Sequence, residues 1–276
     1  MRRWRCSSTT AGTSSTTRTG RRWRASWSPG SRRVGNSPPP PTTSTSRRLR
    51  PLPPDAGDPM STVLVFDIDR LPDDGTARFR RAVPADRRGR ADNFHFPDDR
   101  KRCLAAGVLL RYALLVGHGL REHELHLSRN KFGKPCLTHR PDLHFNLSHA
   151  GRWVVCATSG TRIGVDIEHV AAGTRDIAHR FAPDEHAYVA AAPPAERARR
   201  LIQVWTRKES YLKCVGRGLT TPLNSFSTHP SNPSPSPGLF LKQIPHDDDY
   251  WLAECSEDDS PIDLRHTTTE ALLAVC

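Results

Sequence analysis

The stretch of sequence that decides the fold is Gly164-Val165-Asp166-Ile167-Glu168. Because side chains alternate along a strand, Val165 and Ile167 share one face, and Asp166 and Glu168 share the other. Two carboxylates one pleat apart can converge on a divalent cation that prefers oxygen ligands. The alternative is an ordinary strand with a solvated face, although acidic residues are depleted in strands. The segment predicts a strand of a packed sheet and a candidate metal site.

Strand and helix signals alternate on both sides of this segment. Short apolar runs predict strands over residues 63–66, 143–147, 153–157 and 163–167, and three more over 239–244, 250–255 and 270–276. Helices are predicted from Pro97 to about Leu115, from Pro183 to Pro193, and from about Ala195 to Cys214, with Gly216 as the stop. Two successive sets of helices and short strands predict an α+β (α/β) fold, with two similar halves.

The positive charge of the chain is concentrated near its start. The 276 residues carry a formal net charge of +12. Residues 1–59 hold twelve Arg and two Asp, a net charge of +10, so residues 60–276 carry only +2. Arg, Ser, Thr and Pro dominate this tail, which we expect to be disordered because it cannot bury enough apolar surface. It loosely resembles a transit peptide but shows no amphipathic helix. The abrupt change at Ser61 raises the hypothesis that translation starts at Met60.

Cysteine usage and hydropathy limit the class of protein. The seven cysteines are scattered and form no Cys-x-x-Cys pair, so neither a zinc ribbon nor a disulfide scaffold is expected. Several lie in apolar runs, which indicates small buried side chains in a reducing compartment. No run approaches the roughly 20 apolar residues of a membrane helix, and no signal-peptide hydrophobic region is visible. We expect a cytoplasmic protein without a membrane partner.

A second pattern is Trp205-Thr206-Arg207-Lys208-Glu209-Ser210-Tyr211-Leu212-Lys213. On a helix, Glu209 and Lys213 are neighbours at i,i+4. Taken alone, the segment fits a surface helix on which this ion pair contributes about 0.3–0.5 kcal/mol. Trp205 and Leu212 would then face the core.

Two further polar segments carry side chains that could bind a ligand. Ser148 and His149, within Phe145-Asn146-Leu147-Ser148-His149-Ala150, can donate hydrogen bonds to phosphate oxygens. They make a poor catalytic dyad, because adjacent residues of an extended chain point to opposite faces. Lys131-Phe132-Gly133-Lys134-Pro135 is a turn whose two lysines could meet an anion. Taken alone, the first segment also fits an ordinary polar turn, and the second also fits a solvated loop. The histidines at 123 and 126 lack a matching carboxylate or cysteine and fit an exposed segment.

Each of these patterns is weak evidence alone, but their order along the chain is specific. Lys-x-Gly-Lys-Pro, Phe-Asn-x-Ser-His, Gly-Val-Asp-Ile-Glu and Trp-Thr-x-Lys-Glu-Ser-x-x-Lys follow one another. Over about residues 61–276 the chain thereby resembles the surfactin-type phosphopantetheinyl transferases. The resemblance implies a monomer of two similar α/β halves with pseudo-twofold symmetry. Residues 1–59 would be the tail, 60–163 the N-terminal half and 164–276 the C-terminal half, joined near residues 160–168.

The resemblance also implies a reaction. The phosphopantetheine arm of coenzyme A would move onto a serine of an apo carrier protein, with Mg²⁺ bound by Asp166, Glu168 and Glu209. The serine hydroxyl would attack the β-phosphorus, and 3′,5′-ADP would leave. Glu209 is the expected base, directly or through a metal-bound water, and Lys213 the expected partner at the pyrophosphate. Magnesium and manganese both suit such oxygen ligands.

The coenzyme A contacts follow from the same resemblance. The expected residues are Lys134 and Pro135 beside the adenine, Ser148 and His149 at a phosphate, Lys208 and Lys213 at the pyrophosphate, and Arg87, Arg90 and Arg102 near the nucleotide phosphates. The family often has lysine at the last group, and arginine binds phosphate with a different geometry. Cys103 stands where a hydroxyl residue is expected.

The expected partners are apo carrier proteins or carrier domains of fatty-acid, polyketide or nonribosomal-peptide synthases. The surfactin-type pattern favours the multidomain synthases of secondary metabolism. The acidic recognition helix of a carrier would meet a surface that includes the segment after Arg180, and no specific nucleic acid is expected. Two other hypotheses are a nucleic-acid-binding protein acting through the basic tail and a catalytically silent coenzyme A-binding module. The joint presence of Asp166, Glu168, Glu209 and Lys213 argues against a silent module.

Overall fold

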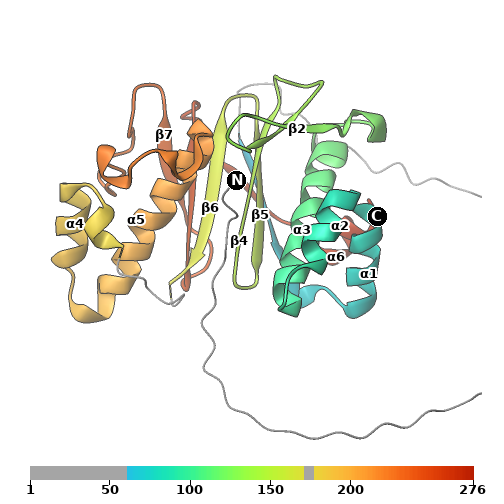
Figure 1. Ribbon diagram of the computed structural model, residues 1–276, viewed down its shortest axis with the longest axis horizontal. Coiled ribbons are helices and arrows are strands. Elements are labelled where there is room, and N and C mark those ends of the chain that lie inside the picture. The colour runs from blue at the N-terminus through green and yellow to red at the C-terminus, as the bar shows by residue number, and fades with distance from the viewer. Residues whose placement is uncertain (1–60, 171–176) are drawn as a thin grey trace, which may run out of the picture. The chain divides into compact units, whose positions relative to one another are not determined.

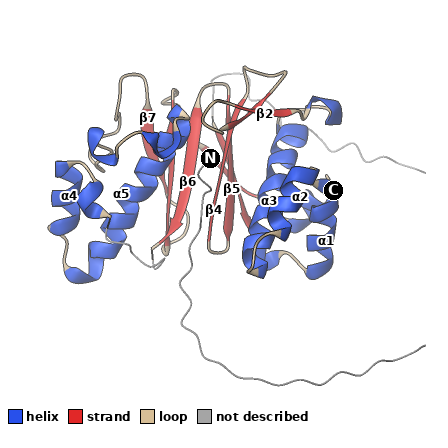
Figure 2. Ribbon diagram, viewed as in Figure 1, coloured by secondary structure: helices blue, strands red, loops and turns tan. Residues whose placement is uncertain are grey.

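The computed structural model describes residues 61–170 and 177–276, which belong to one compact unit. The predictions about residues 1–59 and about a start at Met60 lie outside these described residues. Figures 1 and 2 show two sheets in the middle of the unit, with helices on both outer sides. This layering is an α+β arrangement, which confirms the predicted fold class.

The first sheet has four strands in the order β4-β5-β1-β9. Their bounds are β1 (Thr62–Asp67), β4 (His144–Ala150), β5 (Trp153–Ser159) and β9 (Asp263–His266). Strand β5 runs antiparallel to both β4 and β1, whereas β9 runs parallel to β1. Every residue of β5 is buried, as expected for a central strand covered on both faces.

Four helices cover the outer face of the first sheet. They are α1 (Asp73–Ala82), α2 (Ala85–Asp92), α3 (Pro97–Tyr112), which continues as a π-turn (Ala113–Gly117), and α6 (Thr269–Leu273). Helix α3 begins at Pro97, with Asp98 and Asp99 in its first turn, which stabilises a helix start. Phe66 of the sheet and Phe79 and Leu104 of the helices have no exposed surface and share one core. These contacts hold α1 and α3 against the sheet.

The second sheet has three antiparallel strands in the order β6-β8-β7. Their bounds are β6 (Ile163–His169), β7 (Phe240–Ile244) and β8 (Tyr250–Ser256), and the helices beside them are α4 (Pro183–Ala190) and α5 (Pro194–Val215). Val165 and Ile167 point toward the first sheet and pack with Val63 and Val155. The opposite face of β6, with Asp166 and Glu168, therefore points toward α5.

The edges of the two sheets meet at β4 and β6. Asn146 Oδ1 accepts a hydrogen bond from the backbone N–H of Val165 at 2.9 Å, and Ser148 Oγ accepts one from Ile167 at 3.3 Å. These side chains satisfy backbone donors that an edge strand would otherwise leave unpaired. The Phe-Asn-x-Ser-His segment thus joins the two sheets beside Asp166.

The shorter elements lie mostly at the periphery. They are the β2 (Leu127–Arg129) and β3 (Pro135–Leu137) hairpin and the 3₁₀ turns Ile68–Arg70, Glu122–Glu124, Ala178–Arg180, Gly218–Thr220 and Leu223–Ser225. Among the described residues, no helix combines the length and the apolar character needed to cross a membrane.

The predicted elements match the structure except near the C-terminal end. The strand predicted over residues 270–276 is wrong, because Thr269–Leu273 form helix α6. The Thr268 hydroxyl accepts a hydrogen bond from the N–H of Ala271 and caps this helix. Residues 263–273 return to the first sheet, through β9 beside β1 and through α6 beside α1 and α3. The predicted division into two halves at residues 163–164 therefore remains a prediction. By sequence, residues 263–273 belong to the predicted C-terminal half, but they pack on the sheet that contains β1.

Candidate active site

Helix α5 lies unusually close to β6, and Gly164 is the reason. A Cβ atom at Gly164 would lie 2.2 Å from the backbone nitrogen of Cys214 and 2.2 Å from the carbonyl oxygen of Ser210. Any larger residue would force the backbones of helix and strand apart. The glycine therefore brings Glu209 and Lys213 against the polar face of β6.

Trp205, Glu209 and Lys213 share one face of α5, because they are spaced at about one turn. The Trp205 indole N–H donates to Glu168 Oε1 at 3.1 Å. Two turns later, Lys213 Nζ donates to Asp166 Oδ1 at 2.5 Å. The helix face is thus aligned with both carboxylates of the strand, and Glu209 lies between the two contacts along the helix.

Asp166 is the most enclosed of the three carboxylates, with a relative exposure of 2%. Its Oδ1 accepts a second hydrogen bond from Ser148 Oγ at 2.7 Å. Lys213 Nζ also donates to Ser148 Oγ at 3.0 Å and to the Val165 carbonyl at 3.2 Å. Burial opposes the charge of Lys213, but the carboxylates of Asp166 and Glu209 outweigh it and raise the pKa of Lys213.

Glu168 and Glu209 lie in the electrostatic field of Asp166. Burial, followed by the negative charge of Asp166, raises the pKa of Glu168 to about 8 and that of Glu209 to about 7. Asp166 Oδ2 and Glu209 Oε1 are both buried without a hydrogen-bond partner. Unpaired buried oxygens are costly in a folded protein, and a bound ion or water is one kind of partner that satisfies them.

The side-chain types of this site, though not their spacing in this structure, fit a hard divalent cation. The three carboxylates supply oxygen ligands of the kind such an ion prefers, and two of their oxygens have no partner. In residues 61–170 and 177–276, no group of three or more His, Cys, Asp or Glu is arranged to hold a metal ion. One oxygen of Asp166 is instead bonded to Lys213.

A cavity of about 760 Å³ lies in the first half of the described chain, between α2, α3, the β2–β3 hairpin and β4. Arg87, Arg90, Pro135 and His149 line it, as do Arg129, His126 and an apolar floor that includes Leu110 and Phe145. Arg87 is half-buried and donates to the Cys103 carbonyl at 3.1 Å, and its burial lowers its pKa. The cavity therefore combines guanidinium groups with an apolar surface, as a nucleotide requires.

His149 connects the cavity with the carboxylate site. It lines the cavity, and both Arg102 and Lys213 are close enough to influence its ionisation. Arg102 itself donates to the Gly151 carbonyl at 2.5 Å and to Asp99 at 2.6 Å, so it lies beside the β4–β5 turn. Of the basic groups predicted from the sequence, Arg87, Arg90 and His149 line the cavity, whereas Arg102 does not and Lys213 lies at Asp166.

Ser148 and Lys134 have partners within the protein in this structure. The Ser148 hydroxyl is engaged by Asp166 and Lys213 and belongs to the carboxylate site. Lys134 Nζ donates to the carbonyls of Ile163 at 2.8 Å and Cys214 at 3.3 Å. The phosphate contact of Ser148 and the position of the Lys134-Pro135 turn beside the adenine remain predictions, and Pro135 lines the cavity.

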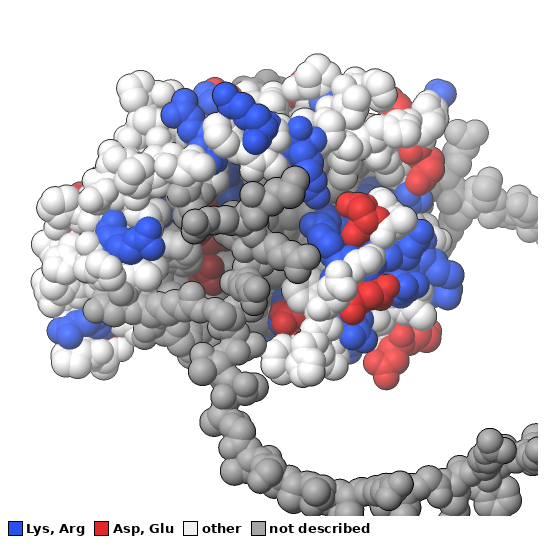
Figure 3. All heavy atoms as spheres, viewed as in Figure 1, with Lys and Arg blue, Asp and Glu red and all other residues white. Residues whose placement is uncertain are grey.

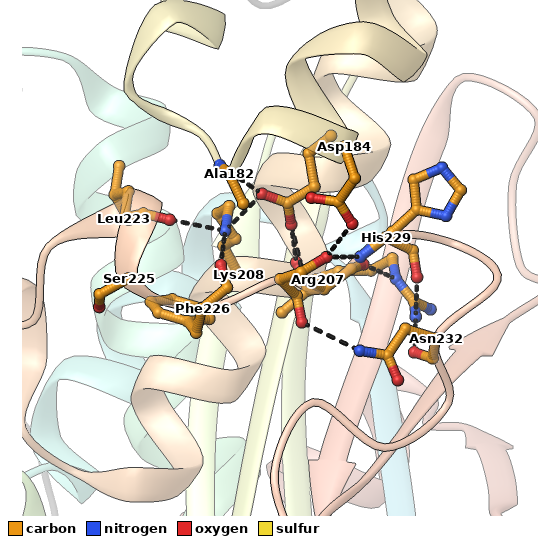
Figure 4. Close-up of polar contacts among 12 residues, drawn as sticks. Ala182, Asp184, Arg207, Lys208, Leu223, Ser225, Phe226, His229 and Asn232 are labelled. Carbon is orange, nitrogen blue, oxygen red and sulfur yellow. Dashed lines mark hydrogen bonds and ion pairs between the residues drawn. The ribbon is translucent and has the colours of Figure 1, made fainter.

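The pyrophosphate contact predicted for Lys208 remains a prediction, because in this structure the Lys208 ammonium has other partners. Lys208 has no exposed surface and pairs with the equally buried Glu185 at 2.6 Å. Its ammonium also donates to the carbonyls of Leu223 and Phe226, each at 2.8 Å (Figure 4). Successive helical residues are rotated by about 100°, so Lys208 points away from the site that Glu209 faces.

Sequence reasoning missed the roles of two residues. Trp205 was expected only in the core, yet its indole N–H holds Glu168. Gly164 was treated only as part of the strand pattern, although its lack of a side chain sets the distance to α5. A tryptophan one turn before Glu209 and a glycine two residues before Asp166 are the signals that could have revealed both roles.

The surface charge is mixed outside the site. Figure 3 shows Lys and Arg interspersed with Asp and Glu on the right side of the unit, where α1 to α3 lie in Figure 1. Arg80 and Asp92 are one such exposed pair, at 2.7 Å. This face is not a uniformly basic surface of the kind that nucleic-acid binding requires.

Comparisons with known proteins agree with this geometry. The family model described as 4′-phosphopantetheinyl transferase superfamily matches residues 162–264, and that described as 4′-phosphopantetheinyl transferase, N-terminal, matches residues 74–161. A 4′-phosphopantetheinyl transferase of Bacillus subtilis is 35% identical over 188 residues, which cover 65% of this chain and 84% of the relative. The 4′-phosphopantetheinyl transferase Sfp of Bacillus subtilis strain 168 is 32% identical over 220 residues, 75% of this chain and 97% of the relative.

A more distant relative has the same named activity. The 4′-phosphopantetheinyl transferase HetI of Nostoc sp. strain PCC 7120 is 30% identical over 183 residues, which cover 62% of this chain and 77% of the relative. The two family-model matches together span the residues of the carboxylate site and those that line the cavity. The chain therefore belongs to the surfactin-type 4′-phosphopantetheinyl transferase family and is a phosphopantetheinyl transferase.

Proposed function

We propose that this enzyme moves the phosphopantetheine arm of coenzyme A onto a serine hydroxyl of an apo carrier protein, in a reaction that depends on Mg²⁺. The observation that carries the proposal is the carboxylate site of Asp166, Glu168 and Glu209 with Lys213, next to a basic cavity. Family membership supports coenzyme A as the donor.

The donor would span the cavity and the carboxylate site. The apolar floor of the cavity suits the adenosine part, and the guanidinium groups of Arg87 and Arg90 suit its phosphate. His149 lines the cavity and is close enough to Lys213 to feel its charge, which supports a pyrophosphate route past these two groups. Arg102 would contribute charge at the β4–β5 turn.

Asp166, Glu168 and Glu209 would hold the magnesium ion, which when bound neutralises negative charge that develops on the phosphate groups. Trp205 would orient Glu168 for this role through its indole hydrogen bond. Lys213 would contact the pyrophosphate.

The transfer forms one oxygen–phosphorus bond and breaks another. The serine oxygen attacks the β-phosphorus of coenzyme A, and the bond to 3′,5′-ADP breaks, so that the electron pair leaves with the nucleotide. Glu209 would accept the serine proton, because its Oε1 lies unpartnered in the site. The products are the phosphodiester-linked carrier and 3′,5′-ADP.

The acceptor would be a carrier protein or carrier domain of fatty-acid, polyketide or nonribosomal-peptide synthesis, with the synthases of secondary metabolism favoured. Its acidic helix would meet the segment after Arg180, where Arg180 ends a 3₁₀ turn and α4 follows. The enzyme would act as a monomer in the cytoplasm.

The test is the intact mass of an apo carrier protein incubated with the full chain, coenzyme A and Mg²⁺. We expect the mass of one phosphopantetheine group to be added, and EDTA to prevent the addition. Glu209→Gln should lose nearly all turnover. Glu196→Gln is the matched control, since Glu196 lies on the same helix but pairs only loosely with Arg200, at 3.6 Å. Coenzyme A binding without transfer to any of several carrier types would instead support a silent binding module.

A further inference from the structure

The ammonium of Lys213 binds Asp166 at a position for which a divalent cation would compete. It makes an ion pair with Asp166 Oδ1 at 2.5 Å and hydrogen bonds to Ser148 Oγ and to the Val165 carbonyl. Asp166 is the least exposed of the three carboxylates that would hold magnesium. Of its two oxygens, Oδ1 has two donors and Oδ2 has none.

Two cations cannot share this carboxylate without a penalty. Like charges a few ångströms apart repel strongly when little water separates them. An Asp166 carboxylate with no cation beside it would also be unfavourable, because buried charges require a partner. A positive charge is therefore needed near Asp166 as long as the carboxylate is ionised, and Lys213 supplies it in the structure described here.

Lys213 is able to leave, whereas Asp166 is not. The Lys213 side chain is 26% exposed and has four rotatable carbon–carbon bonds, so its ammonium can swing outward while α5 remains in place. Asp166 is fixed on β6, between the backbone of α5 and the edge of β4. An exchange of cations at Asp166 thus needs one side-chain rotation and no movement of the fold.

We infer that Lys213 is a displaceable internal counter-ion of the metal site. It neutralises Asp166 while no divalent cation is bound, and it must leave Asp166 Oδ1 for the cation to bind there. The released ammonium then lies beside the site, where a pyrophosphate would be the nearest anionic partner. The cation removes Lys213 from Asp166, and the pyrophosphate of coenzyme A keeps it away. Coenzyme A and the cation consequently favour each other's binding.

This inference rests on the proposed function, because it assumes that Asp166 is a ligand of the cation. It differs from a role for Lys213 at the pyrophosphate alone. A residue that only contacts the pyrophosphate has no need to move when the cation binds in the absence of coenzyme A. A counter-ion at Asp166 weakens cation binding under that same condition.

The first test measures Mn²⁺ binding by electron paramagnetic resonance, with the full chain and without coenzyme A. Lys213→Met should bind Mn²⁺ at least about tenfold more tightly than the wild type, the free-energy equivalent of about 1.4 kcal/mol. Lys242→Met is the matched control and should stay within twofold, because Lys242 has a similar exposure of 21% but bonds to carbonyls of another loop. Equal Mn²⁺ affinities of Lys213→Met and the wild type would overturn the inference.

A second measurement needs no variant and separates displacement from a simple charge effect. The wild-type chain is acylated briefly with acetic anhydride, with and without Mn²⁺, and the modification of each lysine is quantified by mass spectrometry. Displacement predicts that Mn²⁺ increases the acylation of Lys213 and leaves Lys242 unchanged. Tight Mn²⁺ binding without increased acylation of Lys213 would refute the exchange.

The carrier-protein assay keeps the two proposals separate. Phosphopantetheine transfer that needs Mg²⁺, together with unchanged Mn²⁺ affinity in Lys213→Met, would refute the counter-ion and leave the proposed function intact. Failure of Asp166→Asn to weaken Mn²⁺ binding would instead refute Asp166 as a ligand, and the counter-ion would fall with it.

Discussion

Replacing Gly164 by alanine tests whether the close approach of α5 and β6 creates the active site. The added Cβ would lie 2.2 Å from two backbone atoms of α5, where ordinary van der Waals contact begins at 3.4 Å. Helix and strand would have to separate by about 1 Å, since neither contact is with a flexible side chain. Glu209 and Lys213 would move away from Asp166 by a similar amount.

The expected magnitude has two parts. Overpacking of this kind costs about 1–3 kcal/mol in the free energy of unfolding. Misplacement of reacting groups by about 1 Å reduces a rate by about 100-fold. We therefore expect Gly164→Ala to remain folded at 25 °C but to lose about two orders of magnitude in kcat for carrier modification.

The assay is the rate of carrier modification at a saturating coenzyme A concentration, with urea unfolding monitored in parallel. Gly160→Ala is the control, because a Cβ atom at Gly160 would meet nothing within 4 Å. Its rate and its unfolding midpoint should match those of the wild type. A Gly164→Ala enzyme with both values within twofold of the wild type would show that the close approach is not required.

Three further predictions concern residues around the site. Lys208→Met should lower the free energy of unfolding in urea by about 3–5 kcal/mol, because the buried Glu185 would lose its ion-pair partner. A second substitution, Glu185→Leu, should recover part of this loss, and additive losses would contradict the explanation. Trp205→Phe should weaken Mn²⁺ binding about 10- to 100-fold in calorimetry, because the indole N–H no longer holds Glu168; unchanged affinity would remove Trp205 from this role. Arg90→Ala should weaken coenzyme A binding by about 1.5–3 kcal/mol in calorimetry with little change in kcat, whereas Arg88→Ala should not, since Arg88 bonds the Val83 carbonyl.

Much of the fold could be predicted because local signals agree with the tertiary structure. Pro97 and Pro183 start helices, Gly216 ends one, and the alternation in residues 163–167 gives the correct inward face for Val165 and Ile167. Helix α6 was missed because it is short and apolar, and periodicity cannot separate such a run from a strand.

The candidate site was predictable in its composition but not in its contacts. Asp166 and Glu168 could be paired from strand alternation alone. Lys208 is the neighbour of Glu209 in sequence but points in another direction on the helix, toward Glu185, which the sequence did not predict. Its partner lies 23 positions earlier on another helix, and no local pattern connects the two residues.

The return of the chain to β1 has a consequence for how the protein is made. Asp263 pairs with Thr62, and the Thr269 hydroxyl donates to the Arg70 carbonyl 199 positions earlier. A ribosome must therefore synthesise β9 and α6 before the first sheet can be completed, so the N-terminal strand waits with one edge exposed. Contacts between such distant residues also slow folding, because a long loop must close before they form. Chaperone dependence during synthesis would follow from this topology and not from any weakness of the finished core.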